Sequence, residues 1–344
     1  MPPYSNTTTT MNHRSATTSQ PSFTTLHPDI IQSHILNKLD GTSLASTSCV
    51  STELNNLINA ENLWKNCCSN QWPSSLDPLV QPHITNHRFF FSDASSSVHN
   101  LHLGHPVGDV LCSSQSPKMK NLISAVDIFY EDKLIFSRVI ATEYSASWLS
   151  CSPFKIDILE PKEVFPTSVK ITGDDRNCMA EMEKSLKLSW ILIDGDSNRA
   201  LNVSSMCPVS VCRHWLTGDI KVKYATVVPD RRNRDGGEAL MQCGVVVSCK
   251  EGEEMHVKEV SLLVEDDEGL VLDGNEGLEI VQEVIKGERS VKNSNEERKR
   301  YEKFDKLKSD LSEMKERKEH RLDTIVVFSG VSVFLSLCML FLSR

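Results

Sequence analysis

The chain has 344 residues, and its 46 Asp and Glu residues outnumber its 37 Lys and Arg residues, which gives a formal net charge of −9. This length allows one large domain or two modest ones. The mildly acidic balance argues against a general affinity for nucleic acid, which usually requires a basic surface. Since 39% of the residues are hydrophobic, the chain is neither wholly disordered nor a protein with many membrane spans.

Residues 1–24 form a polar stretch rich in Ser, Thr and Pro. They cannot bury enough apolar surface to offset the entropy of the chain, so we expect a disordered arm. No basic region followed by a short apolar run is visible, and hence no secretory signal. The 11 Cys residues are therefore interpreted as reduced cytosolic thiols. Their spacing fits no tight zinc pattern, and neither a metal nor a cofactor is predicted.

Residues 25–70 hold the most informative pattern of the chain. Apolar side chains recur there at helical spacing and predict three or four short helices. Asp40 and Gly41 are expected to end the first helix, and Thr42 or Ser43 to cap the second. Because so small a helical module cannot bury all of its apolar side chains, some should stay exposed until a partner covers them.

At these positions the chain resembles the F-box family. The residues that carry the resemblance are Pro28, Ile31, Ile35, Leu36, Leu39, Leu44, Val50, Leu63 and Trp64. The resemblance implies that they bind a Skp-type adaptor, which connects the chain to a cullin–RING ubiquitin ligase. Those between Pro28 and Leu39 are expected to be exposed in the free chain and buried in the complex.

A looser resemblance, to a group of plant F-box proteins, extends over the whole chain. It rests on the run Phe-Phe-Ser-Asp-Ala at 90–94 and on the apolar C-terminal end. Residues 72–84 are rich in Pro and predict a loop, and residues 88–93 predict a helical turn that packs back on the first module. The resemblance implies a receptor without catalytic residues, which holds a protein substrate near activated ubiquitin.

From about residue 121 to residue 285 the hydrophobic period changes to two, which is typical of half-buried strands. The alternation is clearest at 154–158, 186–192, 220–228 and 260–264. Turn signals lie at 172–174, 194–196, 234–237 and 273–274. Because no long helical pattern intervenes, we predict a mainly antiparallel, β-sandwich-like domain over 84–290 and an α+β fold overall. This domain loosely resembles the phloem-lectin-like domains of some plant F-box proteins.

Polar features of this domain leave alternatives open. The pair His214 and Trp215 either packs at an edge or lines a binding groove. The Arg-rich segment 231–234 is interpreted as a solvated hairpin tip. The acidic segment 251–288 is interpreted as solvated turn charges, or as a surface that meets a basic substrate. No nucleotide-binding, metalloprotease or hydrolase motif is present, so no enzymatic activity is predicted.

Residues 295–323 lack Pro and Gly and are highly charged. Their apolar side chains form a narrow helical stripe of Tyr301, Phe304, Leu307, Leu311 and Met314. The stripe covers too few heptads to predict a coiled coil. A solvated stalk and weak dimerisation through the stripe are the two interpretations.

Residues 324–343 are long and apolar enough for a single transmembrane helix. The residues expected to contact lipid are Ile325, Val326, Val327, Phe328, Val331, Val333, Phe334, Leu335, Leu337, Leu340, Phe341 and Leu342. Basic residues at 315–321 precede the run, as the positive-inside tendency requires. Since the run ends the chain, we expect a tail anchor with the bulk of the protein in the cytosol, and the endoplasmic reticulum as the favoured membrane.

Together these features predict a membrane-anchored substrate-recognition subunit of a Skp–cullin–F-box ubiquitin ligase. Its expected partners are a Skp-type adaptor, an unidentified protein substrate and membrane lipid, with no nucleic acid. The alternative is a membrane-tethered, lectin-like binding protein whose F-box serves no ligase.

Overall fold

The computed structural model describes residues 26–98, 121–143, 152–170, 175–230, 239–250, 252, 254–287, 289–290 and 294–343. The chain divides into two compact units, residues 1–63 and residues 64–344, and each is described by itself. The expected arm at 1–24, the turns at 172–174 and 234–237, and the Arg-rich segment 231–234 lie outside the described residues.

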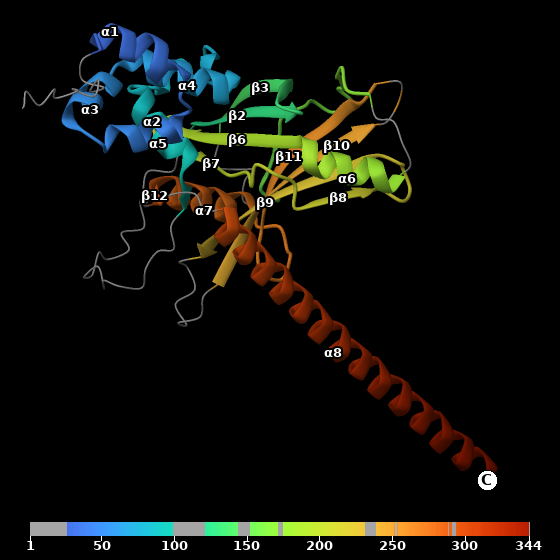
Figure 1. Ribbon diagram of the computed structural model, residues 1–344. Helices are drawn as coiled ribbons and strands as arrows, with labels where there is room; N and C mark the ends of the chain where they lie inside the picture. Colours follow the sequence, from blue (N-terminus) through green and yellow to red (C-terminus); the bar gives the residue numbers. More distant parts are fainter. Residues whose placement is uncertain are drawn as a thin grey trace, which may run out of the picture. The chain divides into compact units, whose positions relative to one another are not determined.

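The first unit consists of short helices (Figure 1). They are α1 Pro28–Ile30, η2 Ile31–Ile35, η3 Leu36–Lys38, α2 Gly41–Ser48 and α3 Thr52–Ile58, and α4 Glu61–Gln71 begins in this unit and continues into the second. The expected caps of the second helix were wrong. Asp40 caps α2, because its carboxylate accepts the backbone N–H of Ser43 at 3.0 Å, and the helix begins at Gly41.

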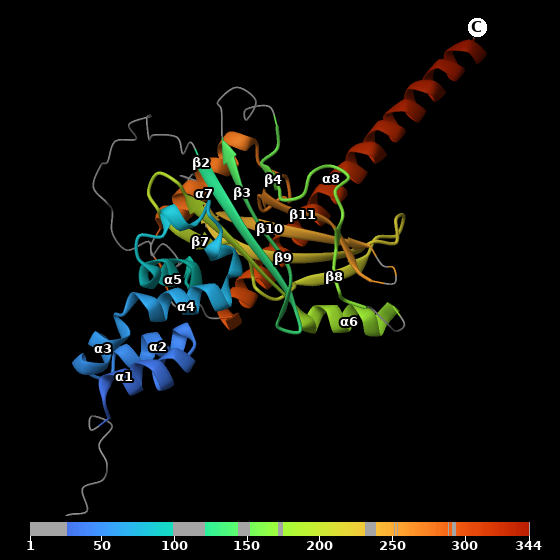
Figure 2. The same ribbon diagram turned by 90° about the horizontal axis from the view of Figure 1, so that it is seen from above.

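The β-rich part of the second unit holds two larger antiparallel sheets, as predicted (Figures 1 and 2). One has the order β3 Lys133–Glu143, β2 Asn121–Tyr130, β6 Leu186–Asp194, β7 Ala200–Asn202. The other has the order β4 Lys155–Asp157, β11 His256–Glu265, β10 Ala239–Lys250, β9 Ile220–Asp230, β8 Ser210–Arg213, and β5 Phe165–Pro166 also pairs with β11. A short pair joins β1 Ser97–Val98 to β12 Arg289–Ser290.

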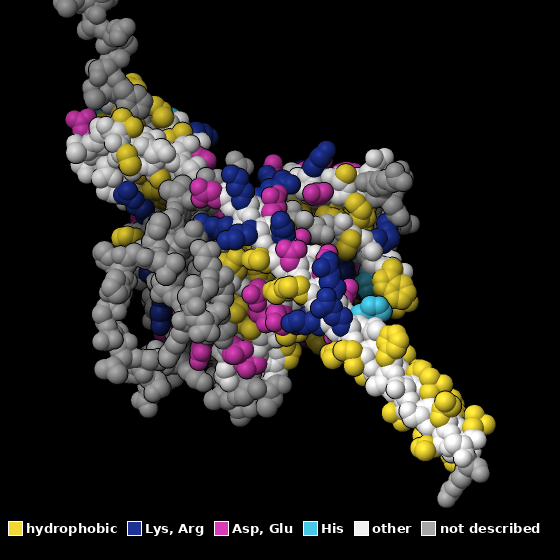
Figure 3. All heavy atoms as spheres, turned by 90° about the horizontal axis from the view of Figure 1, so that it is seen from below, with side chains coloured by type: hydrophobic (Ala, Val, Ile, Leu, Met, Phe, Trp, Pro, Cys, Tyr) yellow, Lys and Arg dark blue, Asp and Glu magenta, His cyan; other side chains and the backbone are white. Residues whose placement is uncertain are grey.

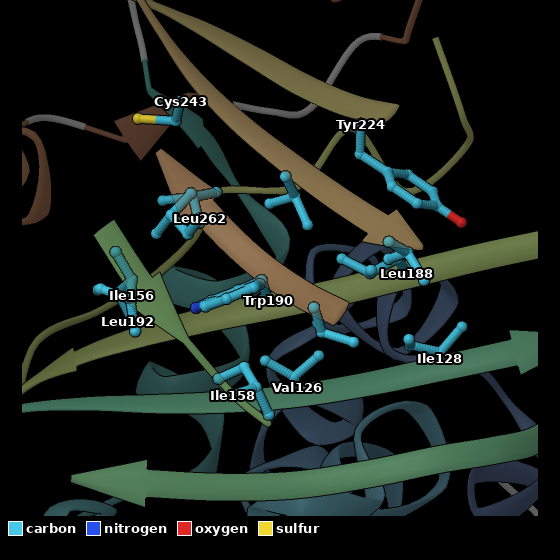
Figure 4. Close-up of a cluster of buried hydrophobic side chains, with 14 of the residues drawn as sticks. Val126, Ile128, Ile156, Ile158, Leu188, Trp190, Leu192, Tyr224, Cys243 and Leu262 are labelled. Atoms are coloured by element: carbon cyan, nitrogen blue, oxygen red, sulfur yellow. The ribbon is translucent and has the colours of Figure 1, made fainter. Parts of the chain in front are cut away.

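Both sheets contribute side chains to one hydrophobic core. Val126 and Trp190 come from the first sheet and Leu262 from the second, and Figure 4 shows them within a single cluster. The period-two alternation seen in the sequence arises because every second residue of a strand enters this core. The α+β class and the antiparallel arrangement are therefore confirmed.

Two helices inside the β-rich region were missed. They are α6 Asp175–Ser185 and α7 Gly274–Lys286, and both add side chains to the core. The turn expected at 273–274 is the start of α7, since the Asp273 carboxylate accepts the backbone N–H groups of Asn275 and Glu276, both at 2.9 Å. The Gly residues at 274 and 277 concealed the helical pattern of α7, because Gly disfavours a helix interior.

The segment that connects the helical module to the sheets is more ordered than the expected loop. It contains η4 Pro73–Leu76, η5 Gln81–His83 and α5 His87–Ser95. The predicted helical turn at 88–93 is confirmed as part of α5. Its packing on the first module stays a prediction, because the contacts of Phe91 described next lie within the second unit. The ring of Phe91 lies 5.4 Å from those of Trp64 and Trp72, centroid to centroid.

One continuous helix, α8 Ser294–Leu342, covers both the charged segment at 295–323 and the apolar run at 324–343 (Figure 1). Its first turns pack against β9, and Phe304 is fully buried. Lys308 Nζ lies 2.8 Å from the Glu265 carboxylate, and Lys315 pairs with Glu268. The interpretation of a wholly solvated stalk is therefore wrong, and part of the acidic segment meets basic residues of the same chain.

Candidate functional site

The residues expected to bind the adaptor differ widely in exposure. Ile31, Leu36, Leu44, Leu63 and Trp64 are buried. Ile35 and Leu39 are half-buried, whereas Pro28 is exposed and Val50 is 73% exposed. The expectation that Ile31 and Leu36 are exposed in the free chain was therefore wrong. Adaptor binding by the nine residues stays a prediction.

Exposed apolar side chains that the sequence analysis did not select lie at Leu26 and Ile30. Ile31–Ile35, which follow these two residues, form a π-helical turn. Such a turn departs from α-helical spacing, and no signal in the sequence announces it.

Trp64 belongs to the second compact unit rather than the first. Phe91 packs on its ring, and the Arg88 guanidinium lies 5.7 Å from the ring centroid, within cation–π range. Asp93, from the same helix α5, forms an ion pair with Arg199 at 2.7 Å. The run at 90–94 therefore has a structural role, since its aromatic side chains pack against the end of α4 and its Asp binds the Arg that precedes β7.

The second unit carries a polar pocket of about 450 Å³ on its larger sheet. Ion pairs line it, with Lys258 Nζ 2.7 Å from Asp219 and Lys155 Nζ 2.9 Å from Asp157. Burial acts to raise the pKa of Asp219. Hydrogen bonds from Lys258 and Thr217 outweigh this effect, so the pKa of Asp219 lies below its ordinary value. The sequence analysis missed this pocket, and the only signal was the alternation of Lys with apolar residues along β9.

The pair His214 and Trp215 lies beside this pocket. His214 is one of the lining residues, and its ring stacks on that of Trp215 at 6.4 Å between centroids. Trp215 is 87% exposed, so the interpretation of a packed edge was wrong and the groove interpretation fits the geometry. Within the described ranges, no group of three or more His, Cys, Asp and Glu side chains is arranged to hold a metal ion.

The distal part of α8 is exposed along its length. Figure 3 shows hydrophobic side chains covering it and Lys and Arg side chains gathered before it. By length and composition alone, α8 is the one helix among the described residues that could cross a membrane. None of its most apolar window is buried within the chain.

A small helical module with exposed apolar side chains is thus followed by a region of two antiparallel sheets that share one core and carry a surface pocket. Residues 26–66 match the family model of the F-box domain. The chain is 39% identical to F-box protein At2g27310 of Arabidopsis thaliana, over 94% of this chain and 97% of the relative. The chain therefore belongs to the F-box protein family.

Further relatives support this assignment. Probable F-box protein At2g36090 of Arabidopsis thaliana is 40% identical, over 96% of each chain. F-box protein At3g44326 of the same plant is 39% identical, over 90% of this chain and 88% of the relative. No solved structure matches the chain. The likeness to plant F-box proteins thus extends well beyond the F-box and into the β-rich region.

Proposed function

We propose that this protein is a substrate receptor of a Skp–cullin–F-box ubiquitin ligase and is held at a membrane by α8. The observation that carries the proposal is the F-box match at 26–66, which coincides with helices that expose apolar side chains. Solvent-exposed groups of this kind mark protein interaction surfaces. At the family level, F-box proteins bind Skp-type adaptors and present substrates to the ligase.

In this proposal the adaptor-binding residues fall into two groups. Pro28, Ile35, Leu39 and Val50 contact the adaptor directly, together with Leu26 and Ile30. Ile31, Leu36, Leu44 and Leu63 are buried and shape the surface from below, and Trp64, which is buried in the second unit, is kept as a proposed adaptor-binding residue. Truncation of a direct contact lowers affinity, whereas truncation of a supporting residue first lowers stability.

The receptor performs no bond chemistry itself. It holds a substrate protein close to the activated ubiquitin, and the gain in effective concentration accelerates transfer. Residues 325–342 of α8 cross the bilayer in this proposal, which confines the ligase to substrates at that membrane surface. We expect the endoplasmic reticulum, which fractionation with organelle markers tests.

Adaptor binding is tested by co-purification of the full-length protein, in detergent, with a plant Skp-type adaptor. Ile30→Asp combined with Val50→Asp places charges in the exposed apolar surface and should abolish capture of the adaptor. The matched control is Leu134→Asp, because Leu134 is 44% exposed, close to the 46% of Ile30, but lies on β3. Full capture by the double variant would refute the proposed surface.

A further inference from the structure

The polar pocket lies on the face of the larger sheet that points away from the hydrophobic core. Glu259 of β11, Ser248 of β10 and Lys221 of β9 are direct cross-strand neighbours in one row, and all three line the pocket. Cross-strand neighbours point to the same face of a sheet. Their side chains therefore meet on the outer surface, beside the turn between β8 and β9.

Most of the charges in the pocket are already paired. Lys258 binds Asp219, and Lys155 is shared between Asp157 and Glu259 at 2.9 and 3.4 Å. Lys221, Lys162 and Glu160 also line the pocket, and none of them forms an ion pair within the described part of the chain. The two lysines leave one positive charge in excess of the Glu160 carboxylate. These two lysines are available to an anionic group that enters from solvent.

Two further donors lie beside these lysines. Ser248 lines the pocket, and its hydroxyl can donate a hydrogen bond to a group that enters it. His214 also lines the pocket, and its Nδ1 accepts the backbone N–H of Thr217 at 3.2 Å, which leaves Nε2 as the ring nitrogen that can donate to a ligand.

An apolar platform adjoins the donors. Trp215 is stacked on His214 with an interplanar angle of 28°, and the neighbouring Leu216 is also largely exposed. Large exposed aromatic side chains next to a pocket are typical of residues that dominate a protein interface. The surface therefore combines donors for an anion with a flat apolar contact a short distance away.

We propose that this pocket binds a segment of the substrate protein in which an Asp or Glu side chain lies close to an aromatic or aliphatic side chain. The carboxylate accepts hydrogen bonds from Lys221, Ser248 and His214, and the apolar side chain packs on Trp215. The inference deepens the proposed function and rests on it, because it names the substrate chemistry of the receptor.

A carboxylate fits better than a phosphate. The carboxylates of the same pocket repel a doubly charged group more strongly than a singly charged one. They belong to Asp157, Glu160, Asp219 and Glu259. The lining also contains Lys but no Arg, and Arg is the residue that recognises phosphate in a bidentate manner.

The test measures binding of short fluorescent peptides to the full-length protein in detergent micelles by fluorescence anisotropy. The peptide set places Asp or Glu at different spacings from Leu, Phe or Trp in a Gly-Ser background. Matched peptides carry Asn or Gln for the acid, Ala for the apolar residue, or phosphoserine for the acid. The wild-type protein should bind at least one acidic–apolar spacing and lose most of this binding with either neutral or Ala replacement.

The variants Lys221→Glu and Trp215→Ala should each weaken this binding by about tenfold or more, the range expected for interface residues that dominate affinity. Lys223→Glu is the matched control, because Lys223 is an exposed residue of β9 that does not line the pocket. This variant should bind the peptides as tightly as the wild type does. Circular dichroism of each variant shows whether the fold is retained.

Several outcomes would overturn the inference. The first two are that no acidic–apolar peptide binds, or that the Asn peptides bind as tightly as the Asp peptides. The others are that Lys221→Glu and Lys223→Glu weaken peptide binding equally, or that the phosphoserine peptides bind more tightly than the acidic ones. Adaptor capture is measured on the same preparations. If the adaptor binds and the peptides do not, the pocket inference alone fails. If the peptides bind and the adaptor does not, the proposed ligase function fails.

Discussion

Asp127 is a buried carboxylate that ties three segments together. It accepts hydrogen bonds from the hydroxyl and the backbone N–H of Ser74 in η4, at 2.6 and 3.1 Å, and from the hydroxyl of Ser137 in β3, at 2.7 Å. Burial raises the pKa of Asp127 above its ordinary value, although the hydrogen bonds oppose the shift. The folded state therefore holds the proton more tightly than the unfolded state does.

This shift determines how Asp127 affects stability as the pH changes. The stability contributed by a raised carboxyl pKa is fully present below the unfolded value of 3.8 and is lost as the pH rises through the folded value. The free energy of unfolding of the wild type, relative to that of Asp127→Asn, should therefore fall as the pH rises above about 4. Urea unfolding in detergent micelles, followed by Trp fluorescence, measures the difference.

The control for this experiment is Asp310→Asn, because Asp310 is exposed on α8. The difference in the free energy of unfolding between Asp310→Asn and the wild type should stay constant over the same pH range. If the free energy of unfolding of the wild type, relative to that of Asp127→Asn, instead rose with pH, the raised pKa of Asp127 would be contradicted.

Helix α7 is positioned by a close approach at Gly277. A Cβ atom there would lie 2.4 Å from Cβ and Cγ of Phe154, which is buried and has no room to move. Gly277→Ala gains up to about 1 kcal/mol in helix propensity, but overpacking costs about 1–3 kcal/mol. The net expectation is a loss of about 1 kcal/mol in the free energy of unfolding.

The matched control is Glu279→Ala on the exposed side of the same helix, which should leave stability unchanged or slightly raised. Thermal unfolding of both variants gives the comparison. A stabilised Gly277→Ala variant would show that α7 can shift away from Phe154 without loss.

The first turns of α8 are held to the second unit by one buried ring and two ion pairs. The Lys308 side chain of α8 comes close to the backbone of Gly269, where a Cβ atom would lie 2.3 Å from Lys308 Cε. Gly269 also has a φ of +79°. Phe304→Asp should release these turns, because a charge cannot occupy the buried site without a partner. Hydrogen exchange of residues 294–315 should then accelerate strongly.

Leu322→Asp is the control for this prediction. Leu322 lies on the same helix and is largely exposed, so exchange in 294–315 should not change. Equal exchange in the two variants would mean that Phe304 does not hold α8.

At the scale of the whole molecule, docking of α8 sets the distance between the β-rich unit and the proposed membrane. Lys315, the last residue paired with that unit, precedes Ile325 by ten residues, which span about 15 Å of α-helix. The pocket-bearing sheets would thus stay near the membrane surface. The proposed receptor therefore acts on proteins at that surface rather than on distant ones.

Deletion of residues 324–344 should move the protein from the membrane fraction to the soluble fraction in plant cells, because no other described helix is long and apolar enough to span a bilayer. Adaptor binding should persist, since the deletion leaves residues 26–66 intact. Deletion of residues 1–24 serves as the control and should leave membrane association unchanged. Membrane retention of the first variant would count against α8 as the anchor.

The sequence by itself determined the class of fold, the F-box and the apolar end of α8. These features depend on periodicity and on ordered motif residues, which are local properties of the chain. The alternation of polar and apolar residues at 220–228 predicted β9 because one strand face must be buried whatever its neighbours are. The set from Pro28 to Trp64 predicted the F-box through its resemblance to the ordered motif of that family.

Only the tertiary structure decided which of these residues are exposed and which distant side chains meet. Ile31 and Leu36 are buried although the sequence predicted them to be exposed, and Phe304 is buried within the second unit although the sequence placed it on an exposed stripe. The pocket joins Lys221, Ser248 and His214 through strand register. Register and docking are set by contacts between segments far apart in the chain, so no local pattern contains them.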